Sequence, residues 1–176
     1  MEEKTLRTTT HFRGRLLQLD VLDVELADGS KTQREVVHHP HAVCAAVLTP
    51  EGEWVLVQQY RVPARQLLIE VPAGKIDPGE DPDKAIRREL EEEVGYRDGE
   101  LIRLAEFWAT PGFCTERMTC YLARNAVLSS NRPDHGEFLE VLRIPATEGL
   151  AWISSGRICD SKSITALLLG ARHLGL

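Results

Sequence analysis

The sequence predicts an α+β protein, in which a mixed sheet is sandwiched between helices and a small antiparallel sheet lies at the N-terminus. Three observations predict this class. Short runs that either alternate between apolar and polar residues or are mainly apolar continue as far as residue 71, which is typical of strands. Capped helical segments follow at residues 81–95 and near the C-terminus. Strands and helices do not alternate regularly, which favours α+β over a parallel α/β sheet.

The composition predicts a soluble, cytoplasmic protein. Its 176 residues match one domain, and 43% apolar and 27% charged residues are close to globular averages. No apolar run is long enough to span a bilayer, and the first residues lack the apolar core of a secretion signal, so we expect no membrane partner. A net charge of −6 argues against a nucleic-acid partner, because phosphate backbones attract clustered Lys and Arg.

The cysteines and the histidine cluster do not predict a disulfide or metal site. Cys44, Cys114, Cys120 and Cys159 are scattered, with neither Cys-x-x-Cys spacing nor the density of a disulfide scaffold. We expect buried or inert thiols. Residues 38–41 (His-His-Pro-His) are interpreted as a strand end, because adjacent side chains in a strand point to opposite faces.

The first part of the chain is rich in strands. Five strands are expected at residues 7–12, 16–25, 33–38, 42–48 and 54–59. Residues 27–29 (Ala-Asp-Gly) indicate a hairpin within the N-terminal sheet, and residues 49–52 (Thr-Pro-Glu-Gly) indicate a second hairpin after it. We therefore divide the chain into N-terminal strands, residues 1–40, and a main domain, residues 41–176.

The clearest helix follows a short apolar strand at residues 67–71 and a loop at residues 75–80. Asp81 can cap its N-terminus, Pro82 suits the first helical position and Gly95 suits the residue after its C-terminus. Its apolar positions are Ala85, Ile86, Leu90 and Val94.

The remaining chain contains three expected strands and two expected helices. The strands are expected at residues 101–108, 118–123 and 138–144, with a loop at residues 109–117 between the first two. The helices are expected at residues 147–155 and 162–174. Asp160 or Ser161 can cap the second helix.

Three glutamates share one face of the helix at residues 81–95. Residues three and four apart lie on the same side of a helix, so Glu89, Glu92 and Glu93 converge while Glu91 points elsewhere. Like charges at these spacings repel each other. A divalent cation such as Mg²⁺, which prefers carboxylate oxygens, explains the cluster better than a solvated acidic face does.

Residues 74–96 resemble the Nudix box. The matching positions are Gly74, Glu80, Arg88, Glu89, Leu90, Glu92, Glu93 and Gly95. Tyr96 departs mildly from the pattern, since an aliphatic residue is usual there. The resemblance implies the Nudix fold and a hydrolase that cleaves a diphosphate.

The same resemblance assigns roles to individual residues. It implies that Glu89 and Glu93 bind metal, that Glu92 is a further ligand or orients water, and that the carbonyl of Ala73 completes the site. The implied ion is Mg²⁺, for which Mn²⁺ can substitute. Arg88 and Glu80 would pair and brace the loop against the helix.

Segments outside the box resemble the ADP-ribose pyrophosphatase subgroup. Residues 59–61 (Gln-Tyr-Arg) and 68–74 resemble the segment that leads into its box, where Arg61 would hold a phosphate and Glu70 would lie near the terminal ribose or the metal. Pro111 has the subgroup's position, which places Gly112 and Glu116 in the implied substrate loop. Substrate-binding residues are therefore expected to be Arg61, Glu70, Pro111, Gly112 and Glu116.

Residues 133–141 resemble the acidic loop that supplies the general base in that subgroup. This implies Glu137 as the catalytic base, with Glu140 and Glu116 as lesser candidates. Members of the subgroup commonly dimerise through the N-terminal strands, so a homodimer is expected. Phe12, Tyr60 or Phe113 could stack on adenine, although such aromatics more often belong to a core.

The resemblance implies hydrolysis of ADP-ribose to AMP and ribose 5-phosphate. A broader nucleoside diphosphate sugar hydrolase, acting on ADP-glucose or GDP-mannose, is the first alternative. A sensor that binds ADP-ribose without cleaving it is the second. Such sensors usually carry an eroded box and an added DNA-binding domain, and neither feature is found in this sequence.

Overall fold

The structure is a computed structural model that describes residues 2–97, 99–125, 127–128 and 139–176. The chain divides into two compact units, Met1–His41 with Trp108–Arg117, and Ala42–Phe107 with Met118–Leu176. The loop at residues 108–117 joins the N-terminal unit because Val37 donates a backbone hydrogen bond to Phe113 (2.7 Å) and accepts one from Thr115 (2.9 Å). The expected division of the chain assigned this loop to the main domain.

The N-terminal unit contains the expected three-stranded antiparallel sheet. Its strands are β1 (Lys4–Arg13), β2 (Gln18–Glu25) and β3 (Lys31–His38), in the order β1-β2-β3. Gly29, with φ of 81°, makes the predicted turn between β2 and β3. Nearly every residue of β1 is exposed.

The second unit contains a seven-stranded sheet with the core order β12-β5-β4-β10-β9, in which β6 pairs with β5 and β7 with β4. These strands are β4 (Ala42–Leu48), β5 (Glu53–Arg61), β6 (Gln66–Glu70), β7 (Ala73–Lys75), β9 (Glu100–Trp108), β10 (Arg117–Arg124) and β12 (Leu139–Pro145). β4 runs parallel to β10 and antiparallel to β5 and β7. The predicted mixed sheet is therefore confirmed.

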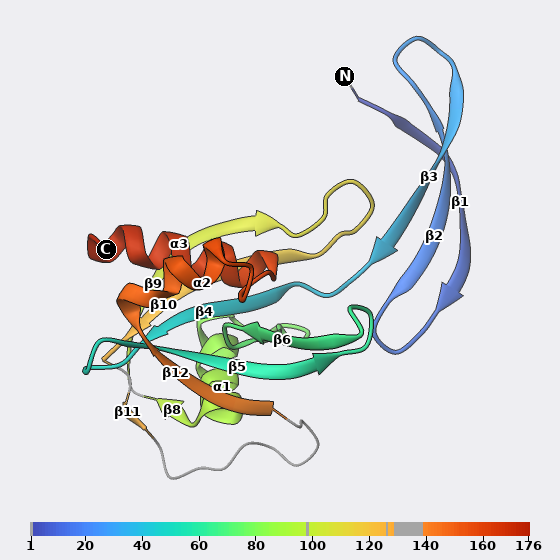
Figure 1. Ribbon diagram of the computed structural model, residues 1–176. Coiled ribbons are helices and arrows are strands. Elements are labelled where there is room, and N and C mark those ends of the chain that lie inside the picture. Colours follow the sequence, from blue (N-terminus) through green and yellow to red (C-terminus); the bar gives the residue numbers. More distant parts are fainter. Residues whose placement is uncertain (1, 98, 126, 129–138) are drawn as a thin grey trace. The chain divides into compact units, whose positions relative to one another are not determined.

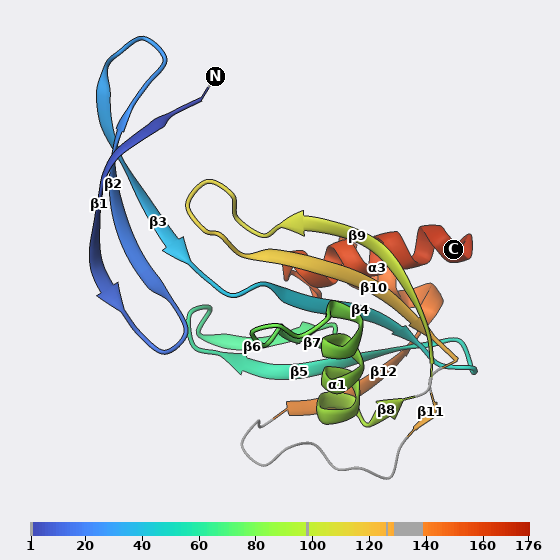
Figure 2. The same ribbon diagram turned by 180° about the vertical axis from the view of Figure 1, so that it is seen from behind.

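Helices cover both faces of this sheet, as Figures 1 and 2 show from opposite sides. α1 (Pro82–Val94) lies on one face, and α2 (Gly149–Ser154) and α3 (Ser161–Leu174) lie on the other. Alternate residues of β4 serve the two cores: Val43 packs in the cluster that includes Ile86 of α1, whereas Cys44 packs in the cluster that includes Leu167 of α3. The sandwich follows from this two-residue period.

The capping residues of the helices lie where the sequence predicts them. Asp81 accepts hydrogen bonds from the backbone of Asp83 and Lys84, and Gly95 ends α1 in the left-handed conformation at φ of 71°. Asp160, and not Ser161, caps α3 by accepting from the backbone of Ser163. No helix within the described ranges is long and apolar enough to cross a membrane.

Three short strands were not predicted. β7 occupies positions expected at the end of a strand and in a loop, and β8 (Tyr96–Arg97) pairs with β11 (Val127–Leu128). Segments of two or three residues show no periodicity, so only pairing with a distant strand makes them extended. For β7 that partner is β4, where Gly74 lies opposite Val43.

Candidate active site

The position of α1 is set by burial of its apolar side and by an anchor at its first turn. Ala85, Ile86, Leu90 and Val94 are buried against the sheet. At the N-terminal end, the hydroxyl of Tyr121 on β10 donates a 2.6 Å hydrogen bond to Asp83. The helix is therefore held along its length, and its glutamates project from a fixed frame.

The Glu89 carboxylate lies against the backbone of β7. A Cβ atom added at Gly74 would be only 1.8 Å from Cδ of Glu89. Such an approach is possible only where the strand residue has no side chain. The glycine of the predicted box is therefore required by the space that the Glu89 carboxylate occupies.

Glu93 contacts the neighbouring residue of the same strand. Its side chain is buried, with 6% of the residue exposed, and its Oε2 accepts a 2.9 Å hydrogen bond from the backbone N–H of Ala73. The structure thus brings together Ala73, Glu89 and Glu93, three of the four residues expected at the metal.

Arg88 connects the remaining acids of the box. Its guanidinium bonds to Glu80 through two nitrogens (3.1 and 3.0 Å), so the predicted brace is present. It also donates to Glu89 at 2.7 Å and to Glu92 at 3.1 Å. The hydrogen bonds that Arg88 donates to Glu80, followed by those to Glu89 and Glu92, raise its pKa despite its partial burial. Arg88 is therefore charged and serves as counter-ion to three carboxylates.

The box side chains suit a hard divalent cation by their chemistry. Glu80, Glu89, Glu92 and Glu93 supply four carboxylates against one guanidinium, a net charge of −3 for the set. Carboxylate oxygens are the donors that Mg²⁺ and Mn²⁺ prefer. In the arrangement shown by the described residues, no three acidic, His or Cys side chains already form a coordinating group. Glu89 and Glu92 are instead bonded to Arg88.

Arg61 and Glu70 form a second charged group in this unit. Both oxygens of Glu70 accept from Arg61, at 2.8 and 2.7 Å, and only 1% of Glu70 is exposed. Lys162 bonds to the same carboxylate and to Asp160 (2.8 Å). Burial alone would raise the pKa of Glu70, but the bonds from Arg61 and the charge of Lys162 outweigh it and hold that pKa below its usual value.

Lys162 was not expected from the sequence, because it is separated from Glu70 by 92 positions and matches no part of the box. The one sequence feature that could have pointed to Lys162 is its position directly after the expected helix cap at Asp160 or Ser161. The Glu70 carboxylate contacts the side chains of Arg61 and Lys162, and its expected contact with ribose or metal stays a prediction.

Three expected substrate residues belong to the N-terminal unit. Pro111, Gly112 and Glu116 lie in the loop at residues 108–117, where Oε1 of Glu116 is 3.5 Å from Nδ1 of His39. Their approach to substrate stays a prediction. The expected base Glu137 lies outside the described residues, whereas Glu140 is exposed on β12 opposite Gln58.

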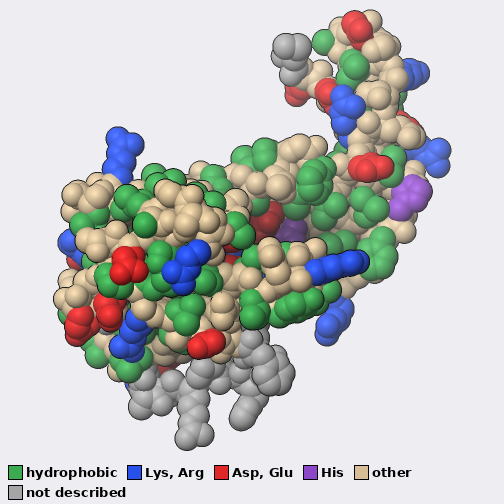
Figure 3. Space-filling view, viewed as in Figure 1, with side chains coloured by type: hydrophobic (Ala, Val, Ile, Leu, Met, Phe, Trp, Pro, Cys, Tyr) green, Lys and Arg blue, Asp and Glu red, His purple; other side chains and the backbone are tan. Residues whose placement is uncertain are grey.

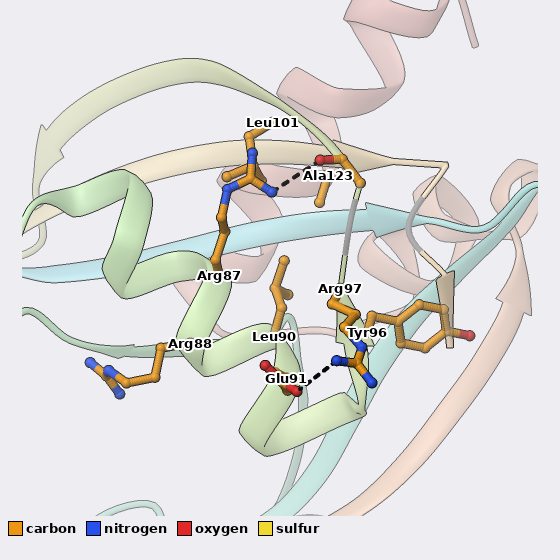
Figure 4. A pocket seen from close by; sticks show the side chains of 9 residues that line it. Arg87, Arg88, Leu90, Glu91, Tyr96, Arg97, Leu101 and Ala123 are labelled. Carbon is orange, nitrogen blue, oxygen red and sulfur yellow. Dashed lines mark hydrogen bonds and ion pairs between the residues drawn. The ribbon is translucent and has the colours of Figure 1, made fainter. Parts of the chain in front are cut away.

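A cavity of about 320 Å³ lies beside a different face of α1. Figure 4 shows that Arg87 and Arg97 line it, while the end of Arg88 points away from them. Glu91 is 3.8 Å from Arg97 here, so it lies apart from the three converging glutamates. Arg88 also lines this cavity, but Glu80, Glu89, Glu92 and Glu93 do not, so the cavity is separate from the carboxylate face.

Comparisons with known proteins agree with this geometry. The family model described as NUDIX domain matches residues 37–158. A methanol dehydrogenase activator of Bacillus methanolicus is 40% identical over 94% of this chain and 91% of its own. An ADP-ribose pyrophosphatase of Bacillus subtilis (strain 168) is 38% identical over 95% and 91%.

Two further similarities concern the alternative substrate and the fold. A GDP-mannose pyrophosphatase of Citrobacter koseri (strain ATCC BAA-895 / CDC 4225-83 / SGSC4696) is 38% identical over 83% of this chain and 80% of its own. A crystal structure of an ADP compounds hydrolase superposes with a TM-score of 0.88, covering 99% of this chain and 95% of that one at 24% identity. The predicted fold is thereby confirmed.

Gly74→Ala tests the close approach of Glu89 to β7. The new methyl group would collide with the far end of a flexible side chain, so the carboxylate should move while the fold survives. Affinity for Mn²⁺, measured by isothermal titration calorimetry, should fall roughly tenfold or more, with an unchanged unfolding temperature.

A double variant shows whether this effect acts through Glu89. Gly74→Ala combined with Glu89→Ala should bind Mn²⁺ no more weakly than Glu89→Ala alone, because the group in collision is already gone. An additional tenfold loss in the double variant would contradict the interpretation.

Proposed function

This chain belongs to the Nudix hydrolase family, and we propose that its reaction is the hydrolysis of ADP-ribose to AMP and ribose 5-phosphate. The observation that carries the reaction class is the placement of Glu89 and Glu93 against Gly74 and Ala73. The ADP-ribose pyrophosphatase relative, which matches 95% of the chain, supports the substrate. Water attacks one phosphorus of the diphosphate: a P–O bond to the water oxygen forms, the bridging P–O bond breaks, and the two hydrogens of the water end on the two phosphate products or are released as protons.

We propose Mg²⁺ as the cofactor, with Mn²⁺ as a substitute. Glu89, Glu92, Glu93 and the carbonyl of Ala73 would hold it. When bound, such an ion neutralises diphosphate charge and lowers the pKa of a coordinated water. The excess negative charge of the box acids supports this proposal, because it favours a cation and would otherwise repel the substrate.

Arg61 is the proposed phosphate-binding residue. Its guanidinium carries five N–H donors, of which Glu70 takes two, and its side chain remains 41% exposed. The other donors can therefore bind phosphate oxygens while Glu70 fixes the plane of the group. Pro111, Gly112 and Glu116 are the further proposed substrate-binding residues.

The proton of the attacking water needs an acceptor, for which we propose Glu137. Glu140 and Glu116 are the lesser candidates. A carboxylate suffices as base because the water is already acidified by the ion. Substituting each of the three by Gln ranks them directly.

A broader nucleoside diphosphate sugar hydrolase is the second candidate. The GDP-mannose pyrophosphatase relative, 38% identical over 83% of the chain, favours it. Both candidates use the same reaction on the same diphosphate, so the choice depends on groups that contact the sugar and the base.

Turnover of a substrate panel decides between these candidates. With Mg²⁺, we expect kcat/KM for ADP-ribose to exceed that for GDP-mannose and ADP-glucose by roughly tenfold or more, because contacts beyond the diphosphate discriminate. Chelation should abolish activity and added Mg²⁺ should restore it. A higher kcat/KM for GDP-mannose would favour the second candidate, and binding of ADP-ribose without turnover of any compound would identify a sensor.

Glu93→Gln tests the carboxylate face. The amide oxygen can still accept from Ala73, so the fold should persist, but a charged oxygen ligand is lost. We expect activity to fall by roughly a hundredfold or more. The matched control is Glu91→Gln on the Arg97 side of the helix, where activity should stay within about twofold. Equal losses in both variants would remove the basis for the metal site.

A cytoplasmic homodimer that binds neither nucleic acid nor membrane is the proposed state of the protein. The N-terminal unit supports dimerisation, because Leu6, Phe12 and Leu16 are between 42% and 55% exposed. Figure 3 shows hydrophobic side chains on the surface of the N-terminal strands. A sheet this small rarely leaves such groups uncovered.

Sedimentation equilibrium tests the dimer. The expected mass is twice the 19.7 kDa of the chain at micromolar concentration. Exchanging Leu6 and Phe12 for Ser should shift the distribution towards the monomer, because it removes apolar surface from the proposed interface. A wild-type mass of one chain would contradict the proposal.

A further inference from the structure

The segment that leads into the box is held from two sides. α1 contacts its later residues, since Glu93 accepts from Ala73 and Glu89 lies against Gly74. The start of α3 contacts its earlier residues, Glu70 and Val71. The second contact is not part of the box, and it has no role in the mechanism described above.

The cap of α3 is a compact polar cluster. The Asp160 carboxylate accepts from the backbone of Ser163 (3.0 Å), from its hydroxyl (2.6 Å) and from Lys162 (2.8 Å). The hydroxyl of Ser163, which is fully buried, in turn accepts from the backbone of Val71 at 2.8 Å. These bonds fix where the Lys162 ammonium lies relative to β6.

Lys162 completes a charge-balanced set. Glu70 and Asp160 contribute two negative charges, and Arg61 and Lys162 contribute two positive ones. Glu70 is 1% exposed, so its carboxylate depends on these cations for stabilisation. If Lys162 were removed, Arg61 would be the one cation of this set left for two carboxylates, Glu70 and Asp160.

Arg61 links this set to the carboxylate face. Its pKa is raised chiefly by the hydrogen bonds that it donates to Glu70, and the charges of Asp160 and Glu93 raise it further. The guanidinium therefore lies within electrostatic range of both the α3 cap and a box glutamate. If Arg61 moved towards Asp160, the positive charge that is proposed to bind the diphosphate would change its position.

We propose that Lys162 is a positioning residue: its ammonium pairs with Glu70 and Asp160, and so keeps Arg61 oriented towards the diphosphate. Lys162 does not touch the reacting atoms in this scheme. This inference rests on the proposed role of Arg61 and extends it to a residue on another element.

Removal of the ammonium should act on binding more than on chemistry. In Lys162→Met the two acids compete for Arg61, so the KM for ADP-ribose should rise about tenfold while kcat stays within about threefold. Lys162→Arg keeps the charge and should restore KM to within about threefold of wild type. Arg172→Met removes a cation from the far end of the same helix and should change neither value.

A cycle with Arg61 separates positioning from a general structural effect. The dissociation constant of the α,β-methylene analogue of ADP-ribose, measured with Mg²⁺, should be no weaker in Arg61→Met/Lys162→Met than in Arg61→Met. A further tenfold loss in the double variant, or equal falls in kcat and kcat/KM for Lys162→Met, would overturn the inference. If Lys162→Met does not fold, as judged by circular dichroism, Lys162→Gln takes its place in the cycle.

The proposed function and this inference fail separately. A wild-type protein that does not hydrolyse ADP-ribose rejects the former. The binding cycle is then run with inorganic pyrophosphate and Mg²⁺, which presents the same diphosphate to Arg61. Coupling between Lys162 and Arg61 in that series would support the positioning role, and its absence would reject it.

Discussion

The contact between α1 and β7 is the constraint on which the rest of the site depends. Two carboxylates lie against consecutive backbone positions, one in the space left by the missing side chain of Gly74 and one on the N–H of Ala73. This contact requires β7 to pair with β4, and it requires α1 to keep its place on the sheet. The cap at Asp81 and the Tyr121–Asp83 hydrogen bond therefore serve the site as well as the fold.

Two arginines near the proposed diphosphate site are each held by a glutamate. Glu80 bonds two nitrogens of Arg88, and Glu70 bonds two nitrogens of Arg61. A guanidinium pinned in this way loses less conformational entropy when its other donors bind a ligand. The two differ in their surroundings, because Arg88 contacts further box acids whereas Glu70 is shared with Lys162.

Much of the fold could be predicted because its signals are local. The turn at Gly29, the caps at Asp81 and Gly95 and the apolar run that forms β4 each follow from neighbouring positions. Likewise, helical spacing predicted the shared face of the glutamates. The pairing of β7 with β4 and the contact of Lys162 with Glu70 depend on residues far apart in sequence, and no local pattern encodes them. Tyr96 departs from the box pattern yet is buried in the α1 core, where an aromatic ring serves as an aliphatic residue would.

Residues 70–74 are held by two helices, α1 and α3, which lie on opposite faces of the sheet and contact different parts of this segment. α1 carries the acids of the box and holds the end of the segment at Ala73 and Gly74, so we expect changes there to alter the reaction itself. α3 holds the beginning at Glu70 and Val71 and reaches Arg61 through Glu70, so we expect changes there to alter how the diphosphate is held. The family box can therefore stay constant while the proposed positioning of the diphosphate by Arg61 varies, because Glu70 is held in part by a helix that lies outside the box.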